Sequence, residues 1–202
     1  MTARGVLLAV CVAVVVSACF GRPAPHTETY VIDPPAPATA PASSHPQTLR
    51  MGNVRVAPAF ASPALVYRMD EVQFTPDFYH AFIADPGPLL GAAMAQWLDR
   101  AGLFKTVFQP GSVVTAPYAL EATVTQLYGD FRPGQKPAAV MTVQFTLVDL
   151  SGPSAVVVLD RFIGRRIDLP EATPDALVRG YSQALGEILT ELSKQIVLPE
   201  AQ

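Results

Sequence analysis

Ala-Val-Met-Thr-Val-Gln-Phe-Thr-Leu-Val-Asp, residues 139–149, lies in the clearest β region of the chain. Its apolar and polar residues alternate: Met141, Val143, Phe145 and Leu147 stand between Thr142, Gln144 and Thr146. Because successive side chains of a strand point to opposite faces, this alternation predicts a strand with one buried and one wet face.

Two neighbouring segments extend the pattern. Tyr118–Leu127 alternates in the same way, and a Ser-Gly-Pro turn at residues 151–153 leads into Ala155–Ile163. Three such strands joined by short loops predict an antiparallel meander. Shorter strands are expected at residues 28–33, 49–57, 64–69, 71–74 and 103–108.

Two helices are predicted, each with start and stop signals. Asp85-Pro86 precedes apolar residues at helical spacing, and Gly102 is a glycine stop. Thr173-Pro174-Asp175 begins a second apolar stripe that runs to Ile196. The predicted fold is therefore α+β, a largely antiparallel sheet with two amphipathic helices packed on one face.

The N-terminus has the pattern of a secretory signal. Arg4 is followed by an apolar run from Gly5 to Val16 and by Ser17-Ala18-Cys19. The run is too short to cross a bilayer, and small residues before a cysteine resemble the lipobox of bacterial lipoproteins. That resemblance implies cleavage before Cys19 and acylation of Cys19. An ordinary cleaved signal peptide is the alternative.

This pattern divides the chain into a signal peptide (residues 1–18), a tether (19–27) and a single α+β domain (28–202). A Pro-rich connector is expected at residues 34–46. The tether reaches roughly 25 Å, so the domain is expected close to the membrane.

Composition excludes several functions. Half of the residues are apolar, with 14 basic against 17 acidic and no basic tract, so nucleic-acid binding has no electrostatic basis. Of the two cysteines, Cys11 lies in the signal and Cys19 is expected to carry lipid, which leaves no thiolate metal site. His26, His45 and His80 are scattered. We expect no metal, no cofactor, no catalytic residues and no enzyme.

The order of signals resembles the auxiliary lipoproteins of ABC-type transport systems over nearly the whole mature chain. The resemblance rests on the lipobox, Thr29–Asp33, Val66-Tyr67-Arg68, Gly102–Val107 and the strand end Leu147-Val148-Asp149.

The resemblance implies a non-catalytic lipoprotein anchored at the periplasmic face of the cell envelope. It further implies an ABC permease, an ATPase and a mammalian-cell-entry protein as partners, with phospholipid or other hydrophobic molecules as cargo. Phe20, which is not the aspartate that retains many lipoproteins on the inner membrane, favours the outer membrane.

Tyr67, Arg68 and Phe131 are the candidates for partner binding, because aromatic and arginine side chains anchor interfaces. The alternatives are a core Tyr67, a solvated Arg68 and a Phe131 that folds back on the sheet. Arg165-Arg166 is a candidate for binding lipid phosphates, and simple solvation of both side chains is the alternative. Two other functions stay open: a carrier that encloses an apolar ligand, and a structural or assembly lipoprotein.

Overall fold

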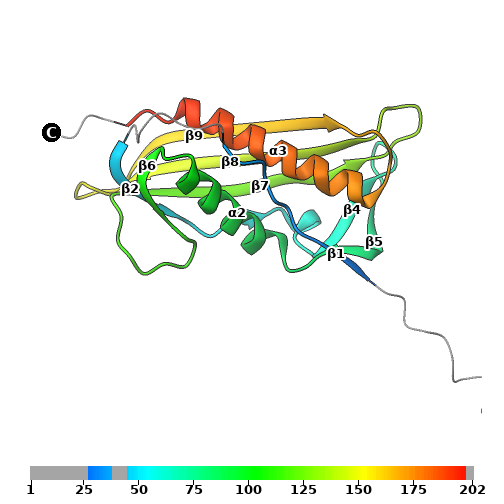
Figure 1. Cartoon of the computed structure of the whole chain (residues 1–202), viewed down its shortest axis with the longest axis horizontal. Coiled ribbons are helices and arrows are strands. Elements are labelled where there is room, and N and C mark those ends of the chain that lie inside the picture. Colours follow the sequence, from blue (N-terminus) through cyan, green and yellow to red (C-terminus); the bar gives the residue numbers. More distant parts are fainter. Residues whose placement is uncertain (1–26, 38–44, 199–202) are drawn as a thin grey trace, which may run out of the picture.

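The structure, a computed structural model, describes residues 27–37 and 45–198 (Figure 1). The predicted signal peptide and nearly all of the tether lie outside the described residues. The described elements follow in this order: β1 Glu28–Tyr30, β2 His45–Met51, β3 Arg55–Val56, the 3-10 helix η1 Pro58–Phe60, β4 Ala64–Arg68, β5 Phe74–Phe82, α2 Pro86–Arg100, β6 Phe104–Phe108, β7 Tyr118–Asp130, β8 Ala138–Asp149, β9 Val156–Asp168 and α3 Pro174–Gln195. None of the helices described is both long enough and apolar enough to span a bilayer.

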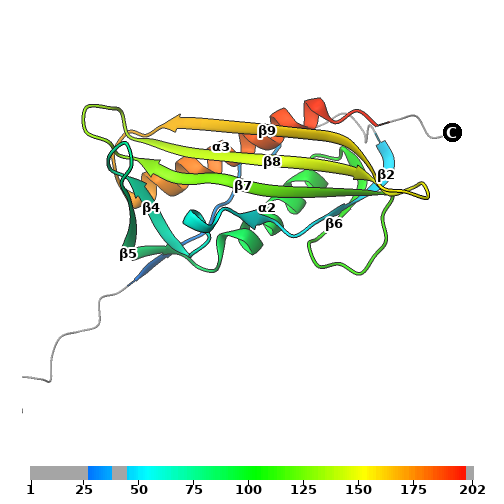
Figure 2. The same cartoon turned by 180° about the vertical axis from the view of Figure 1, so that it is seen from behind.

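The meander of β7, β8 and β9 is confirmed and forms the long axis of the molecule (Figure 2). Within the meander each strand is antiparallel to the next; Tyr118 pairs with Asp149, and Ala138 pairs with both Asp130 and Asp168. Among the described strands β9 is bonded to β8 alone, so its other side is a sheet edge within the part of the chain that the structure describes.

The prediction of a largely antiparallel sheet is wrong, because the sheet is mixed and most of its pairs are parallel. The strands β2, β3 and β4 pair in parallel with successive parts of β7, and the pairs β1–β5 and β2–β6 are also parallel. Among the described strands, the antiparallel pairs are the two pairs of the meander and the pair β4–β5. Side chains alternate in the same way in parallel and in antiparallel strands. The direction of a strand depends on connections that the residue pattern does not reveal.

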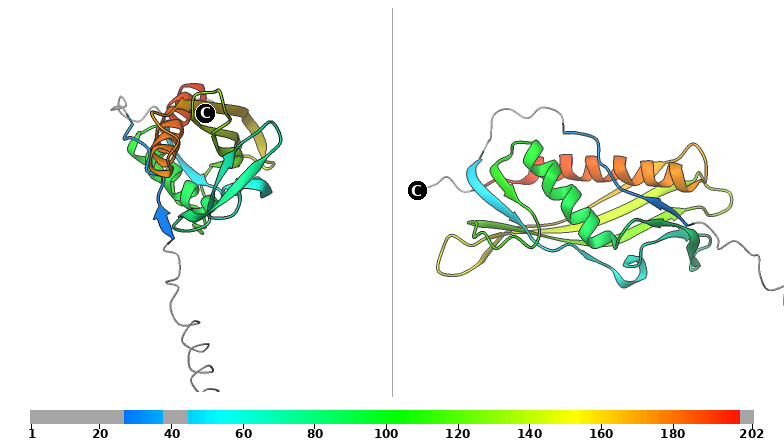
Figure 3. Two further views of the ribbon diagram at one scale, coloured as in Figure 1. Left: turned by 90° about the vertical axis from the view of Figure 1, so that its right-hand side faces the viewer. Right: turned by 60° about the horizontal axis from the view of Figure 1, so that its bottom comes forward.

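Both helices lie on one side of the sheet (Figure 3). Helix α3 packs along β8 and β9, and α2 packs against β6 and β3. Met141, Val143, Phe145 and Leu147 of β8 are fully buried under α3, whereas Thr142, Gln144 and Thr146 remain partly exposed on the other side. The predicted division into a helix-covered and a wet face is therefore correct.

The helix boundaries follow the predicted signals. The Thr173 hydroxyl accepts a hydrogen bond from the amide of Ala176 at 3.4 Å and caps α3. Asp85 is the N-cap of α2, but its side chain makes no capping hydrogen bond. Gly102, with φ of +64°, follows α2 as a left-handed stop.

Two strand predictions were displaced. Residues 69–73, part of which was predicted as a strand, form the turn of a hairpin, and β5 begins only at Phe74. The aromatic residues at 78–82 belong to this strand, although their sequence shows no alternation that predicts one. β2 begins at His45, inside the range expected to be a connector.

Candidate functional site

The structure brings the three predicted partner-binding residues together where β4 and β7 end. Tyr67 and Arg68 of β4 pair in parallel with Gly129 and Asp130 of β7. The amide of Phe131, the first residue after β7, donates to the carbonyl of Arg68 at 2.9 Å. Residues that are far apart in sequence therefore form one continuous surface.

Phe131 folds back on the sheet and stacks on Tyr67. The two ring centroids are 5.0 Å apart and the ring planes are inclined by 15°. A Cβ atom at Gly129 would lie 3.3 Å from the Phe131 ring and 3.0 Å from Leu177, so glycine leaves the room that this packing needs. The stack buries part of both aromatic rings.

The Tyr67 hydroxyl donates to Asp77 at 2.6 Å, and His80 Nδ1 lies 2.8 Å from the same carboxylate oxygen. Burial, followed by the hydrogen bond to Asp77, raises the pKa of Tyr67 well above its usual value. Burial alone would raise the pKa of Asp77, but hydrogen bonds from Tyr67, the Tyr79 amide and His80 outweigh it and lower that pKa. Tyr67 is thus held neutral against a carboxylate that stays ionised.

Arg68 organises the hairpin turn that follows it. Its guanidinium donates to the carbonyls of Asp70 (3.2 Å) and Glu71 (2.9 Å) and pairs with the Glu71 carboxylate. Its Cζ also lies 5.7 Å from the centroid of the Phe74 ring. The Arg68 side chain therefore stabilises the hairpin turn and is not a simply solvated charge.

Beneath this surface lies a buried carboxylate that the residue pattern does not predict. Asp130 is 1% exposed, and Arg132 donates to both of its oxygens, at 2.8 and 2.9 Å. Arg166 donates to it at 2.6 Å, and Arg132 also reaches Glu71 at 2.6 Å. The hydrogen bonds from Arg132, followed by burial that opposes them and by the bond from Arg166, hold the pKa of Asp130 far below its usual value.

The sequence feature that indicates this network is a single acidic residue, Asp130, which ends an apolar strand two residues before Arg132. Arg165 and Arg166, considered for lipid phosphates, lie within β9 and face carboxylates, Glu187 at 3.4 Å and Asp130 respectively. Long-range pairing of this kind depends on the register between β7, β8 and β9, which a residue pattern does not fix.

Above the network the hairpin turn is exposed. We call residues 69–73 the hairpin tip. Val72 is 87% exposed and Met69 is 40% exposed, whereas the side chains of Arg68 and Arg132 beneath them are mostly covered. The site thus presents two exposed apolar side chains, Met69 and Val72, beside the acidic Asp70 and Glu71, on a base that ion pairs and stacked rings hold in place.

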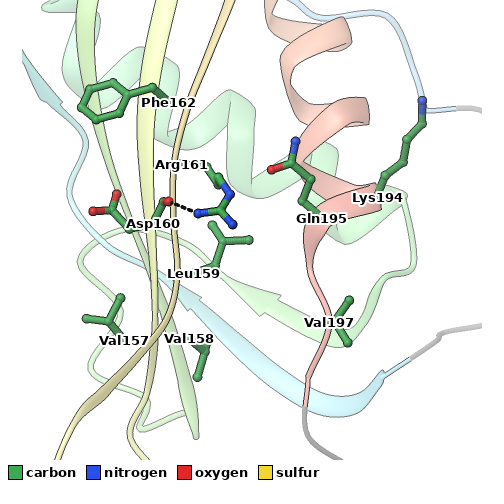
Figure 4. A pocket seen from close by; sticks show the side chains of 9 residues that line it. All are labelled: Val157, Val158, Leu159, Asp160, Arg161, Phe162, Lys194, Gln195 and Val197. Atoms are coloured by element: carbon green, nitrogen blue, oxygen red, sulfur yellow. Dashed lines mark hydrogen bonds between the residues drawn. The ribbon is translucent and has the colours of Figure 1, made fainter.

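A second feature is a groove of about 650 Å³ along the free edge of β9 (Figure 4). One side is formed by β9 and the other by the end of α3 and the residues after it. The lining residues are Val157, Val158, Leu159, Asp160, Arg161, Phe162, Lys194, Gln195 and Val197. Apolar and charged side chains are mixed along it.

Among the described residues, no three His, Cys, Asp or Glu side chains are grouped as a metal site would require. Asp130 is surrounded by arginines, and Asp77 by a tyrosine and a histidine. The site offers surfaces for contact.

The model of one protein family, described as the ABC-type transport auxiliary lipoprotein component, matches residues 30–196. The chain belongs to this family. The matched residues contain every strand and helix of the described fold except the start of β1.

Solved structures share the fold of this auxiliary lipoprotein. Protein XCC0632 from Xanthomonas campestris, of the family DUF330, matches with a TM-score of 0.70 and 17% identity over 82% of this chain and 93% of its own. An uncharacterized protein matches with a TM-score of 0.63 and 16% identity over 82% of this chain and 100% of its own. A comparison with curated protein sequences gives no significant match.

The family supports a role in transport as an auxiliary component. Cys19, the predicted lipid attachment site of this auxiliary lipoprotein, lies outside the described residues, so its acylation remains a prediction.

Proposed function

We propose that this chain is a non-catalytic, lipid-anchored component of an ABC-type transport system that moves phospholipid or other hydrophobic molecules between membranes. The match of the auxiliary lipoprotein family to residues 30–196 carries this proposal. The cysteine after small residues at Val16–Cys19 supports it independently.

Acyl chains on Cys19 anchor the chain to the periplasmic face of the envelope, at the outer membrane rather than the inner. One acyl chain holds a protein to a membrane only marginally, whereas two or more give durable attachment. Residue 20 is phenylalanine, which favours the outer membrane. The domain then meets its partners within a short distance of the bilayer.

The partners are the permease and ATPase of the transporter and a protein of the mammalian-cell-entry type. We assign their docking surface to the hairpin tip and to the base formed by Tyr67, Arg68 and Phe131. Interfaces are anchored by apolar side chains presented on a preorganised base, because little conformational freedom is then lost on binding. The hydrogen bonds of Arg68 to the hairpin turn and the stacking of Tyr67 on Phe131 form such a base.

The test is a substitution of Val72, which points into solvent at the hairpin tip. We expect Val72→Asp to reduce co-purification of the transporter by at least about tenfold, because it places an unpaired charge in an apolar contact. The measurement is a quantitative pull-down of the full chain from cells after crosslinking.

Val113→Asp is the matched control. Val113 is 99% exposed and lies in the loop after β6, at the other end of the molecule (Figure 1). If Val72→Asp captures as much transporter as Val113→Asp does, the hairpin tip is not the docking surface.

A carrier role is the second candidate, and the groove along β9 is the observation that favours it. Val157, Val158 and Val197 give it apolar walls, and Lys194 gives it a cation. The space between the sheet and the helices, where the sequence suggested a ligand, is filled by buried side chains such as Phe145 and Leu185. Phospholipid retained by the purified chain in native mass spectrometry, and lost in a Val157→Asp variant, would establish this role.

A further inference from the structure

The strand β5 exposes two aromatic side chains to solvent. Phe78 is 82% exposed and Tyr79 is 54% exposed, although both lie inside a strand of nine residues. Aromatic rings are large apolar surfaces, and leaving two neighbours in water forgoes the burial that stabilises most such residues. The local backbone explains how they come to project outwards.

A bulge in β5 turns these residues out. On β4 the register advances from Ala64 to Val66, while on β5 the partners change from Ala81 to Pro76, which leaves three extra residues on β5. The Asp77 carboxylate holds this bulge, because one of its oxygens accepts from the amides of Tyr79 (2.7 Å) and His80 (3.1 Å). Bulges re-aim side chains and are a recurrent device near functional surfaces.

Neighbouring apolar residues continue the same surface. β1 pairs in parallel with β5, Tyr30 opposite Phe82, and the amide of Ile83 donates to the Tyr30 carbonyl. Tyr30 and Phe82 face inwards, so alternation places Val31 and Ile83 side by side on the outer face together with Tyr79. Val31 and Ile83 are both more than half exposed. We call Val31, Phe78, Tyr79 and Ile83 the β1–β5 patch.

The patch lies where the chain from the N-terminus enters the fold. Glu28 is paired with His80, so the chain that precedes β1 arrives beside the bulge at Phe78 and Tyr79. Cys19 is eight residues before Thr27, a separation that cannot exceed about 28 Å even when fully extended. Acyl chains on Cys19 therefore hold a bilayer surface within that distance of Thr27, which precedes the strand β1 beside the patch.

We infer that the β1–β5 patch rests in the interfacial layer of the bilayer that carries the acyl chains of Cys19. This inference rests on the anchoring part of the proposed function. Tyrosine combines an apolar ring with a polar tip and favours the headgroup level, and phenylalanine and isoleucine favour the acyl boundary beneath it. The acyl chains supply attachment, and the patch supplies a fixed orientation.

The charges around the patch determine which lipids it favours. Glu28 is exposed beside it, bonded to the Tyr30 hydroxyl at 2.9 Å and 3.7 Å from His80. The contact therefore depends on apolar burial and not on attraction to anionic headgroups, and we expect it with zwitterionic phosphatidylcholine.

This orientation also places the docking surface. The hairpin tip precedes β5, whereas the β1–β5 patch runs from the middle of β5, at Phe78 and Tyr79, to Ile83 just beyond its far end beside β1 (Figure 3, left). A molecule that rests on the patch holds the hairpin tip away from the bilayer.

The test uses the acylated full-length product in phosphatidylcholine vesicles that contain a lipid with a nitroxide high on its acyl chain. Cleavage removes Cys11 and acylation blocks Cys19, so Ile83→Cys provides a single site for a fluorescent label. We expect the nitroxide to quench this label several-fold more than a label at Val113→Cys. Equal quenching at the two sites would overturn the inference.

A Phe78→Ser/Tyr79→Ser pair in the Ile83→Cys background tests the aromatic residues. Loss of two buried rings is expected to lower the ratio of docked to free molecules by at least about tenfold. Unchanged emission of Trp97, the single tryptophan, which is buried and bonded to the Pro35 carbonyl at 2.8 Å, would show that the variant is folded. Undiminished quenching in the folded variant would overturn the inference.

Two further readouts separate this inference from the function on which it rests. The mass of the protein reports acylation, so an unmodified Cys19 would refute the anchor itself. A label at residue 83 that is shielded from aqueous iodide but not quenched by the nitroxide would show that a protein covers the patch. That result would overturn the bilayer contact and leave the anchor standing.

Discussion

At the scale of single residues, Asp130 shows how the end of the sheet is held. A carboxylate with 1% exposure is tolerated because two arginines donate to it, from the loop after β7 and from β9. Removing one partner from a buried ion pair leaves the other charges unpaired, which costs more than the pair itself contributes. The network therefore ties β7, β9 and, through Glu71, the hairpin tip together.

We expect Asp130→Asn to lower the free energy of unfolding by about 2–4 kcal/mol, because Arg132 and Arg166 lose their counter-charge. Urea unfolding followed by the emission of Trp97 measures this change. Asp160→Asn is the control, since Asp160 is exposed on β9, and its effect should stay below about 0.5 kcal/mol. Equal stability of the two variants would show that the network contributes little.

The same carboxylate predicts a dependence on pH. Its pKa is lowered in the folded protein, whereas an unfolded aspartate titrates near pH 3.9. The unfolded chain thus binds the proton first as the pH falls, so the stabilisation is complete above about pH 4 and decreases towards the folded pKa. The difference in stability between the wild type and Asp130→Asn should shrink below pH 4. Urea unfolding of both proteins at each pH measures this difference, and the subtraction cancels the contribution of carboxyl groups that titrate alike in both proteins.

At the scale of elements, the close approach of α3 to the sheet depends on a glycine. A Cβ atom at Gly180 would lie 2.6 Å from Leu169 Cδ2 and 2.7 Å from Ala139 Cβ. Alanine forms helices more readily than glycine by about 1 kcal/mol, so helix propensity alone predicts that Gly180→Ala stabilises the protein. The Ala139 methyl group opposes this gain, because it has no other rotamer to adopt and the helix or the strand would have to shift.

Gly180→Ala is expected to lower the free energy of unfolding by about 1–2 kcal/mol, the cost of overpacking less the gain in propensity. Arg179→Ala, at the exposed neighbouring position of the same helix, provides the control and should be neutral or slightly stabilising. A Gly180→Ala variant that unfolds at higher urea than the wild type would show that the helix shifts without cost.

The elements also show where sequence reasoning succeeds and fails. The meander, both helices and the Thr173 cap are local patterns, so they were predicted correctly. The parallel pairing of β2, β3 and β4 with β7 and the bulge at Asp77 were not, because direction and register depend on partners far away in the chain. The sequence indicates three separate residues, Tyr67, Arg68 and Phe131. The stacking of Tyr67 on Phe131 and the bonds of Arg68 to the hairpin turn are visible only in the fold.

At the scale of the whole molecule, the proposed function combines the lipid anchor at Cys19 with the β1–β5 patch and the hairpin tip. We expect Cys19→Ser to reduce the membrane-bound fraction by at least about tenfold, since the remaining chain carries no acyl group. Fractionation of cells and the mass of the mature chain measure this. Cys11→Ser, which changes the other cysteine, should leave both unchanged. A Cys19→Ser chain that is still processed, membrane-bound and active would contradict the proposed function.

The amino-acid sequence by itself determined the helices, the meander, the buried faces of β7 and β8 and the predicted lipid attachment at Cys19. These depend on the spacing of residues that are close along the chain. Only the tertiary structure decided the mixed direction of the sheet, the Asp130 network and the exposure of Phe78 and Tyr79. Each of these follows from which distant segments pair and in what register, and that pairing is set by packing of the whole chain rather than by any local pattern.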